Sequence, residues 1–189
     1  VGGGEGAFTA LGRHYNPMVM ALASLPVPVI AAVNGPAAGI GCSIALAADF
    51  VIAGSSAYFL QAFVNIGLVP DGGASWMLPR LVGKAQATRM MMLGEKIPAE
   101  EAERIGLIYR RVADDALMDE AKALAAKLAG GPTVALGAMK QAIRRGLEAD
   151  FSTTLQYEAE AQRVAGNSKD AMEGGMAFLQ KRKPEFKGE

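Results

Sequence analysis

Residues 28–53 read PVIAAVNGPAAGIGCSIALAADFVIA, and this segment carries the strongest structural signal in the chain. Its β-rich apolar run at 29–33 predicts a buried strand that stops at the turn dipeptide Asn34-Gly35. Glycines at 35, 39 and 41 precede an Ala/Leu-rich stretch at 42–48 with good helix propensity. Residues 50–53 predict a second strand. The segment therefore predicts a strand, a glycine turn, a buried helix and another strand.

The glycine turn is a candidate site for a negative charge. The first N–H groups of a helix lack intrahelical partners and point outward together with the positive end of the helix dipole. Such a turn can hold a developing oxyanion, or it can be only a tight connection in a buried α/β layer. It is not a dinucleotide fingerprint, because Ile44 stands where the third glycine would fall. Nor is it a P-loop, because no Lys-Ser/Thr pair follows.

Composition bounds the class of protein. The 189 residues suffice for one well-buried domain with a helical appendage, and the 19 basic and 19 acidic residues cancel, so a nucleic-acid surface is unsupported. Cys42 is the single cysteine, which excludes an intrachain disulfide and fits a reducing cytoplasmic location best. One cysteine and one histidine cannot build a zinc site. No apolar stretch approaches the ~20 residues that span a bilayer. Val1 is not a natural start, and Gly2-Gly3-Gly4 predicts a flexible loop, so we expect that the chain begins mid-protein.

The pattern along the chain changes from mixed α/β to helical. Asn16-Pro17 predicts the N-cap and first residue of a helix that ends before Pro26. Beyond the strand–turn–helix segment, residues 57–70 are apolar and irregular, and the loop at 70–73 follows them. Helices are expected at 75–81 and 84–93, separated by Gly83, then from Pro98 to Gly106, with a short strand at 107–112.

From Asp114 onward the sequence predicts only helices, at roughly 115–129, 132–147, 151–165 and 168–182. The second of them carries apolar residues at a period that predicts a buried face: Val134, Met139, Ile143 and Leu147. We therefore expect two domains, an α/β core over 1–112 and a helical module over 113–189. A module so separate from the sheet could pack on another subunit as readily as on its own.

Several blocks together resemble one family. The segment 28–53, then GLVPDGG, LPRLVGKAQA, GEKIPAEEAERIGLI and EGGMAFLQKRKPEF, are similar to the crotonase, or enoyl-CoA hydratase/isomerase, superfamily. The resemblance covers essentially the whole chain. It implies a spiral ββα core with a C-terminal helical trimerisation module, assembled as a homotrimer or hexamer. It also implies acyl-CoA thioester substrates, with coenzyme A as part of the substrate and no metal or redox cofactor.

The resemblance also assigns binding residues. In the family two backbone N–H groups hold the thioester enolate; the second falls here on Ile40, flanked by Gly39 and Gly41, and the first lies on an earlier loop that this chain lacks. A family lysine that reaches the CoA phosphates of a neighbouring subunit matches Lys181. On residue chemistry alone, the run at 181–183 is a solvated helix end favoured by the dipole.

Two departures count against simple hydration. Family hydratases use two glutamates to position and activate water, and Ser43 and Phe63 stand at those positions. Without either carboxylate, water addition has no evident general acid or base.

Asp71 is the remaining acid/base candidate. In the loop at 70–73 it is either a turn residue that caps the following helix or the working carboxylate, which isomerases of the family place at this position. GLVPDGGASWMLPR resembles the 1,2-epoxyphenylacetyl-CoA isomerase branch of phenylacetate breakdown. An apolar wall from Phe63, Val64 and Trp76 would raise the pKa of Asp71 by desolvation and suit it to shuttle a proton.

The sequence thus predicts an acyl-CoA isomerase that shifts a double bond or opens an epoxide ring. Ile40 and Asp71 are the catalytic candidates, and Gly39, Gly41, Phe63, Trp76 and Lys181 are the substrate-binding candidates. The alternatives are an enoyl-CoA hydratase of fatty-acid β-oxidation and a catalytically silent acyl-CoA-binding subunit.

Overall fold

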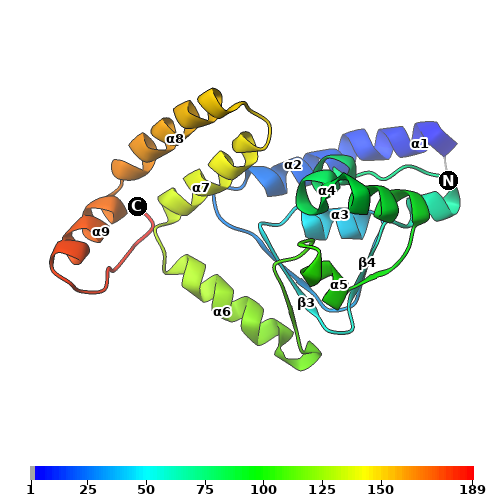
Figure 1. The fold of residues 1–189 in the computed structure, drawn as a ribbon. Helices are drawn as coiled ribbons and strands as arrows, with labels where there is room; N and C mark the ends of the chain where they lie inside the picture. Colours follow the sequence, from blue (N-terminus) through cyan, green and yellow to red (C-terminus); the bar gives the residue numbers. More distant parts are fainter. Residues whose placement is uncertain (1–2) are drawn as a thin grey trace. The chain divides into compact units, whose positions relative to one another are not determined.

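The computed structural model describes residues 3–189, which form two compact units (Figure 1). Unit 1 comprises residues 3–23 and 29–121, and unit 2 comprises residues 24–28 and 122–189. The predicted domain boundary after residue 112 stays a prediction. Val1 and Gly2, on which part of the predicted opening loop falls, lie outside the described residues.

A long helical segment opens unit 1. Helix α1 (Gly3–Ala10), a π-helical turn (Leu11–Tyr15) and α2 (Asn16–Ser24) follow one another without a break, so the loop predicted at Gly3 and Gly4 is wrong. The predicted N-cap at Asn16 is also wrong, because its φ and ψ are helical and its N–H donates to the carbonyl of Leu11. A proline inside a helix removes one hydrogen bond and crowds the preceding turn. The wider π turn contains Arg13, the residue four before Pro17 whose carbonyl a helical proline crowds.

The first sheet of unit 1 is parallel. It has the order β1-β3-β6, with β1 at Ile30–Val33, β3 at Phe50–Gly54 and β6 at Arg110–Val112. Ile30 pairs with Phe50 and Val33 with Ala53, so both strands predicted from the opening segment form and pair with each other. Strand β3 is buried over residues 51–54, as its apolar composition predicts for a sheet covered on both faces.

Unit 1 also contains a second small sheet. Strands β1 and β3 of the first sheet are each followed along the chain by a strand of the second. Its order is β2-β4-β5, with β2 at Pro36–Ala38, β4 at Tyr58–Leu60 and β5 at Ile97–Pro98; β2 and β4 are parallel, and β5 is antiparallel to β4. The chain thus runs β1-β2-α3 and then β3-β4-α4, a ββα repeat. Sequence patterns missed β2 and β4, because strands of three residues are too short to show a period.

Helices pack on these strands. Gly83 interrupts α4 with a φ of 74° and a ψ of 163°, which confirms the predicted separation of two helices there. The helical elements of unit 1 beyond α2 are α3 (Ile40–Leu46), a 3-10 turn (Ala62–Ile66), α4 (Ala74–Leu93), α5 (Ala99–Arg104), a 3-10 turn (Asp114–Ala116) and the start of α6 (Leu117–Ala129).

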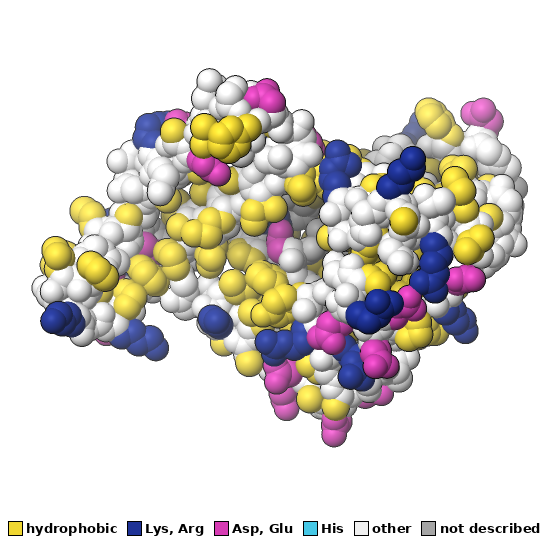
Figure 2. All heavy atoms as spheres, viewed as in Figure 1, with side chains coloured by type: hydrophobic (Ala, Val, Ile, Leu, Met, Phe, Trp, Pro, Cys, Tyr) yellow, Lys and Arg dark blue, Asp and Glu magenta, His cyan; other side chains and the backbone are white. Residues whose placement is uncertain are grey.

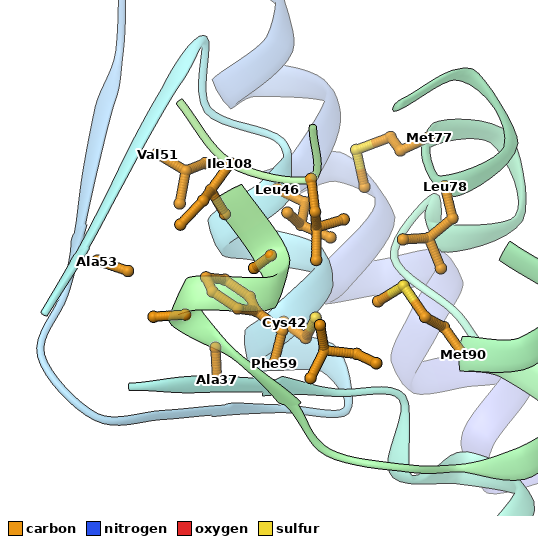
Figure 3. Packing of buried hydrophobic residues seen from close by; sticks show 14 of the residues in the cluster. Ala37, Cys42, Leu46, Val51, Ala53, Phe59, Met77, Leu78, Met90 and Ile108 are labelled. Carbon is orange, nitrogen blue, oxygen red and sulfur yellow. The ribbon is translucent and has the colours of Figure 1, made fainter. Parts of the chain in front are cut away.

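One apolar core holds unit 1 together (Figure 3). Cys42 and Leu46 of α3 project among side chains from both sheets, α4 and α5, and Phe59 of β4 is completely buried. Full burial of an aromatic or aliphatic side chain of this size contributes about 1.5–3 kcal/mol. Because α3 lies inside this cluster, its first turn has a fixed position relative to both sheets.

Unit 2 consists of helices up to Leu179, followed by a C-terminal tail over residues 180–189. After the end of α6 it contains α7 (Thr133–Gly146), α8 (Phe151–Gly166) and α9 (Lys169–Leu179), near the helices that the sequence predicts. Asp150 and Ser168 cap α8 and α9 by accepting the N–H groups of Thr153 and Ala171. The segment at 24–28 joins this unit, where the Lys140 Nζ donates to the carbonyl of Val27 at 3.2 Å.

The predicted buried face of α7 is wrong for the single chain. Met139, Ile143 and Leu147 are 57%, 68% and 49% exposed. Apolar side chains also gather on the visible surface of α8 and α9 (Figure 2). The helical period reports that a face is apolar, but it does not report whether the covering surface belongs to the same chain. Across residues 3–189, no helix has the combined length and apolar character needed to cross a bilayer.

Candidate active site

The glycine turn leaves two amide groups unpaired at the start of α3. Gly39 has a φ of 54°, a conformation that favours glycine, and its N–H donates to the carbonyl of Leu60 at 2.9 Å. The carbonyl of Gly39 then accepts the N–H groups of Cys42 and Ser43. Within residues 3–189 the N–H groups of Ile40 and Gly41 have no acceptor. They are the amide groups from which the sequence predicts one oxyanion donor.

Phe63 forms an apolar wall beside this turn. It lies in the 3-10 turn after β4 and is 8% exposed. Its ring is so close to Gly39 that a Cβ added there would meet the Phe63 Cζ at 3.7 Å. Val64, the next residue, is 38% exposed. The aromatic ring of Phe63, a predicted substrate-binding residue, therefore lies against the glycine turn.

The loop that carries Asp71 rests on the first turn of α3. The buried hydroxyl of Ser43 donates to the backbone carbonyl of Asp71 at 2.8 Å, and the N–H of Ala74 donates to the same carbonyl at 3.2 Å. Gly72 has a φ of 60°, and a Cβ there would lie 2.5 Å from Ile40 Cδ1 and 2.9 Å from Ser43 Cβ. Only glycine permits so close an approach. Ile40, Ser43 and the Asp71 loop are therefore neighbours in space.

The Asp71 carboxylate is not a helix cap. Gly73 is the N-cap of α4, and no side chain makes the capping hydrogen bond. Oδ1 of Asp71 is buried without a hydrogen-bond partner among the described residues, and burial raises the pKa of this carboxyl above its usual value. Asp71 therefore begins a turn, as predicted, through its backbone carbonyl, but its carboxylate does not cap the helix. An unpaired, partly desolvated carboxylate is a stronger base than an exposed one.

Two other predicted substrate-binding residues, Trp76 and Lys181, lie in different units of the chain. Trp76 of α4 packs partly buried against the apolar core, and the Arg80 guanidinium stacks over its ring at 4.2 Å from the centroid. Among the described residues, no side-chain hydrogen bond or ring contact joins Trp76 to Ile40 or Asp71. Lys181 lies in unit 2, directly after α9, and its φ of 53° is left-handed.

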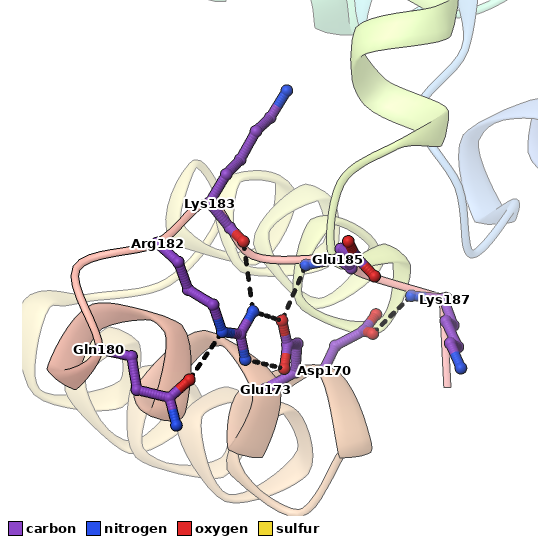
Figure 4. Close-up of polar contacts among 7 residues, drawn as sticks. All are labelled: Asp170, Glu173, Gln180, Arg182, Lys183, Glu185 and Lys187. Atoms are coloured by element: carbon purple, nitrogen blue, oxygen red, sulfur yellow. Dashed lines mark hydrogen bonds and ion pairs between the residues drawn. The ribbon is translucent and has the colours of Figure 1, made fainter.

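Lys181 adjoins a network of carboxylates that binds the C-terminal tail to α9 (Figure 4). Glu173 accepts two hydrogen bonds from the Arg182 guanidinium, at 2.6 and 2.8 Å, and one from the N–H of Glu185. Asp170 accepts the N–H groups of Lys187 and Gly188 at 2.7 and 2.8 Å. We call this arrangement, with Asp170 and Glu173 as acceptors, the tail clasp.

Sequence reasoning missed Gln61. Its side chain is completely buried, and neither amide atom reaches a hydrogen-bond partner within the described residues. Cys42 nearby is equally buried, and desolvation raises the pKa of its thiol to about 12, which leaves it a packing residue. The sequence signal that could have identified Gln61 is its position as a polar residue directly after the apolar strand β4. Among residues 3–189, no three metal-binding side chains gather at one point.

Comparison with known proteins yields consistent matches. The family model described as enoyl-CoA hydratase/isomerase matches residues 3–189. A Rhodobacter capsulatus protein named "Probable enoyl-CoA hydratase" is 50% identical over 180 residues, which cover 95% of this chain and 70% of that protein. A 1,2-epoxyphenylacetyl-CoA isomerase from Escherichia coli is 49% identical over 176 residues, covering 93% of this chain and 67% of the relative.

Solved structures agree with the fold. The crystal structure of an enoyl-CoA hydratase from Bacillus anthracis superposes with a TM-score of 0.93 at 35% identity, covering 98% of this chain and 72% of that one. The predicted fold class, an α/β ββα spiral core followed by a helical region, is confirmed.

Proposed function

The chain belongs to the enoyl-CoA hydratase/isomerase family, and on that premise we propose that it isomerises acyl-CoA thioesters, with Asp71 as the acid and base. The family's activity is hydration or isomerisation of acyl-CoA compounds. Two relatives of nearly equal identity carry names from the two reactions, so their names favour neither. The choice between them rests on the residues of this chain.

The observation that carries the proposal is the state of Asp71. Its Oδ1 is buried without a partner, on a loop that packs against Ile40 and Ser43. The two positions that the family pattern gives to hydratase glutamates hold a serine, whose hydroxyl is already engaged, and a buried phenylalanine. This supports a mechanism with one carboxylate, which suffices for moving a proton. Water addition would need a further group to activate the water.

In the proposed reaction a 3-enoyl thioester loses a proton from Cα to the Asp71 carboxylate. The C–H electron pair moves into a dienolate whose negative charge lies on the thioester oxygen, where the Ile40 N–H donates to it. The carboxylic acid then returns a proton to Cγ, and the double bond moves into conjugation. No atom is gained or lost, and no electron leaves the substrate, so the step needs no oxidant or reductant. Opening of an epoxyphenylacetyl thioester would use the same oxyanion site.

The test is product analysis with the purified chain on three substrates: a 3-enoyl-CoA, a 2-enoyl-CoA and 1,2-epoxyphenylacetyl-CoA. We expect turnover of the first or the third to a product of unchanged mass. Asp71→Asn, which keeps the size of the side chain but cannot accept the proton, should lower kcat by roughly 10²–10⁴-fold. Assays in H₂¹⁸O separate the alternatives, because a hydrated product carries the label.

Three outcomes would contradict the proposal. Labelled hydroxyacyl-CoA as the main product would identify a hydratase. Full activity of Asp71→Asn would remove Asp71 from the mechanism. Tight binding of the thioesters without turnover of any substrate would support the silent subunit.

We also propose that the chain assembles with copies of itself as a homotrimer or hexamer and that Lys181 contacts the CoA moiety. The exposed apolar side chains of α7 support this assembly, because such a face costs free energy when it stays in water. Light scattering on the eluting protein measures the mass. Ile143→Glu should lower the measured mass to that of one chain. Glu158→Gln, a change at a residue that is already polar and exposed, should leave the mass unchanged.

A further inference from the structure

We propose that Ser43 is a positioning residue: its hydroxyl holds the main chain of Asp71, and with it the catalytic carboxylate, against the helix that supplies the oxyanion donor. The inference rests on the proposed role of Asp71 and extends it to a residue that the family pattern marks only as a missing glutamate.

The first support is the hydrogen bond itself. Ser43 is completely buried, and its Oγ donates to the Asp71 carbonyl at 2.8 Å across 28 residues of sequence. A buried hydroxyl that lost this acceptor would be left unpaired, so the bond persists in the folded protein. The same carbonyl accepts the N–H of Ala74, which closes the turn of the loop. The backbone of Asp71 is therefore held both by its own turn and by α3.

The second support is the packing around that bond. Gly72 approaches Ile40 Cδ1 and Ser43 Cβ so closely that any side chain there would displace one of them. Residues 40 and 43 are three apart in α3 and lie on one face of the helix. The oxyanion donor at Ile40 and the anchor at Ser43 are thus parts of one rigid element. The hydrogen bond fixes the separation between the site of developing charge and the base.

Among residues 3–189, no hydrogen bond or ion pair engages Oδ1 of the Asp71 carboxyl. Burial is the cause of its raised pKa, and no ionic interaction contributes. The only titratable side chain on α3 is Cys42, whose thiol has its pKa raised to about 12 and stays neutral. If the Ser43 bond is lost, the loop gains freedom, and water reaches Oδ1. We then expect the pKa of Asp71 to fall toward its ordinary value.

The experiment compares Ser43→Ala, Ser43→Cys and Ser55→Ala. Ser55 is the matched control: its hydroxyl also bonds to a residue distant in sequence, Asp114, but at an exposed position outside the site. For Ser43→Ala we expect kcat to fall roughly 10- to 100-fold with KM nearly unchanged, because the base is misplaced while the binding groups remain. The acid limb of the kcat/KM profile should move to lower pH. Ser43→Cys, which retains a weak donor, should be intermediate.

Two readouts separate a positioning role from a structural one. Thermal unfolding checks that the variants are folded, and a carboxyl ¹³C titration, assigned with Asp71→Asn, follows the Asp71 pKa without any assay. The inference is overturned if Ser43→Ala has the same kcat as Ser55→Ala. It is also overturned if Ser43→Ala has a lowered kcat but the pKa of Asp71 is unchanged. If Asp71→Asn is inactive in that case, the proposed function stands. If Asp71→Asn is fully active, both proposals fail.

Discussion

Asp71 and Glu173 place the same functional group in opposite surroundings. Oδ1 of Asp71 is buried with no partner, and desolvation raises the pKa of that carboxyl. Glu173 accepts two hydrogen bonds from the Arg182 guanidinium and one from the N–H of Glu185, and these donors lower its pKa to about 2. Asp170, the other acceptor of the tail clasp, is likewise buried and accepts two backbone N–H groups.

Under the proposed mechanism, this difference separates a structural carboxylate, Glu173, from one suited to proton transfer, Asp71. A carboxylate that accepts a full set of hydrogen bonds is a weak base with a fixed position. The free energy of those hydrogen bonds stabilises the chain segment that they hold. A carboxylate denied its partners keeps a high proton affinity at some cost to stability. The two regions therefore respond to mutation in opposite ways.

Displacing the Asp71 loop should have the largest effect. In Gly72→Ala the new Cβ meets Ile40 Cδ1 and Ser43 Cβ, and the left-handed φ adds about 1–2 kcal/mol of strain. We expect kcat to fall by roughly 100-fold or more. Gly67→Ala is the matched control, because Gly67 has a similar φ of 72° and open space around it. Equal kcat values for the two variants in a steady-state assay would show that the position of the loop is unimportant.

Removing an acceptor from the tail clasp should affect stability. Asp170→Ala leaves the N–H groups of Lys187 and Gly188 without their acceptors, and we expect a loss of about 2 kcal/mol in urea unfolding. Hydrogen exchange should become faster at residues 187–188. Asp150→Ala, which removes the cap of α8, should lower the stability by less and leave that exchange unchanged. Unchanged stability and unchanged exchange at residues 187–188 in Asp170→Ala would show that the Asp170 carboxylate does not hold the tail.

The Glu173 contribution should depend on pH. Because its folded-state pKa is depressed from 4.5 to about 2, the stabilisation is present above pH 4.5 and is lost as pH falls through about 2. Glu173→Gln should therefore melt a few degrees below the wild type at neutral pH, and the gap should narrow in acid. Glu158→Gln serves as the exposed control. A gap that stays constant down to pH 2 would contradict the assignment.

Asp71 should show the smaller effect with the opposite sign. Its folded-state pKa is raised from 3.8, so its neutral form is favoured by folding; that stability is full below pH 3.8 and is lost as pH rises through the raised value. Asp71→Asn, which is always neutral, should melt slightly above the wild type at neutral pH and match it below pH 3.8. Calorimetry over this range measures the difference. A less stable Asp71→Asn at neutral pH would mean that the carboxylate has partners.

Local sequence signals located most of the elements. Glycine at 83, 94 and 106 and proline at 98 mark the ends of helices or breaks within them, and the four helices predicted after Asp114 lie near α6 to α9. These signals work because backbone preference and apolar period act within a few residues. They failed where the context was not local. Asn16-Pro17 has the composition of a helix start, yet the preceding helix continues through it.

Neighbouring residues in the sequence alone determined the glycine turn before Ile40, the strands on either side of it and the helical end. Whole motifs determined the family to which the chain is similar, and only that resemblance implied the ββα core. Only the tertiary structure decided which polar atoms find partners. Ser43 reaches Asp71 across 28 residues, whereas the Asp71 carboxylate, which resembles a helix cap in the sequence, makes no capping bond. Solvation and hydrogen bonding of a side chain depend on distances across the fold, and those distances set its pKa and thus its chemistry.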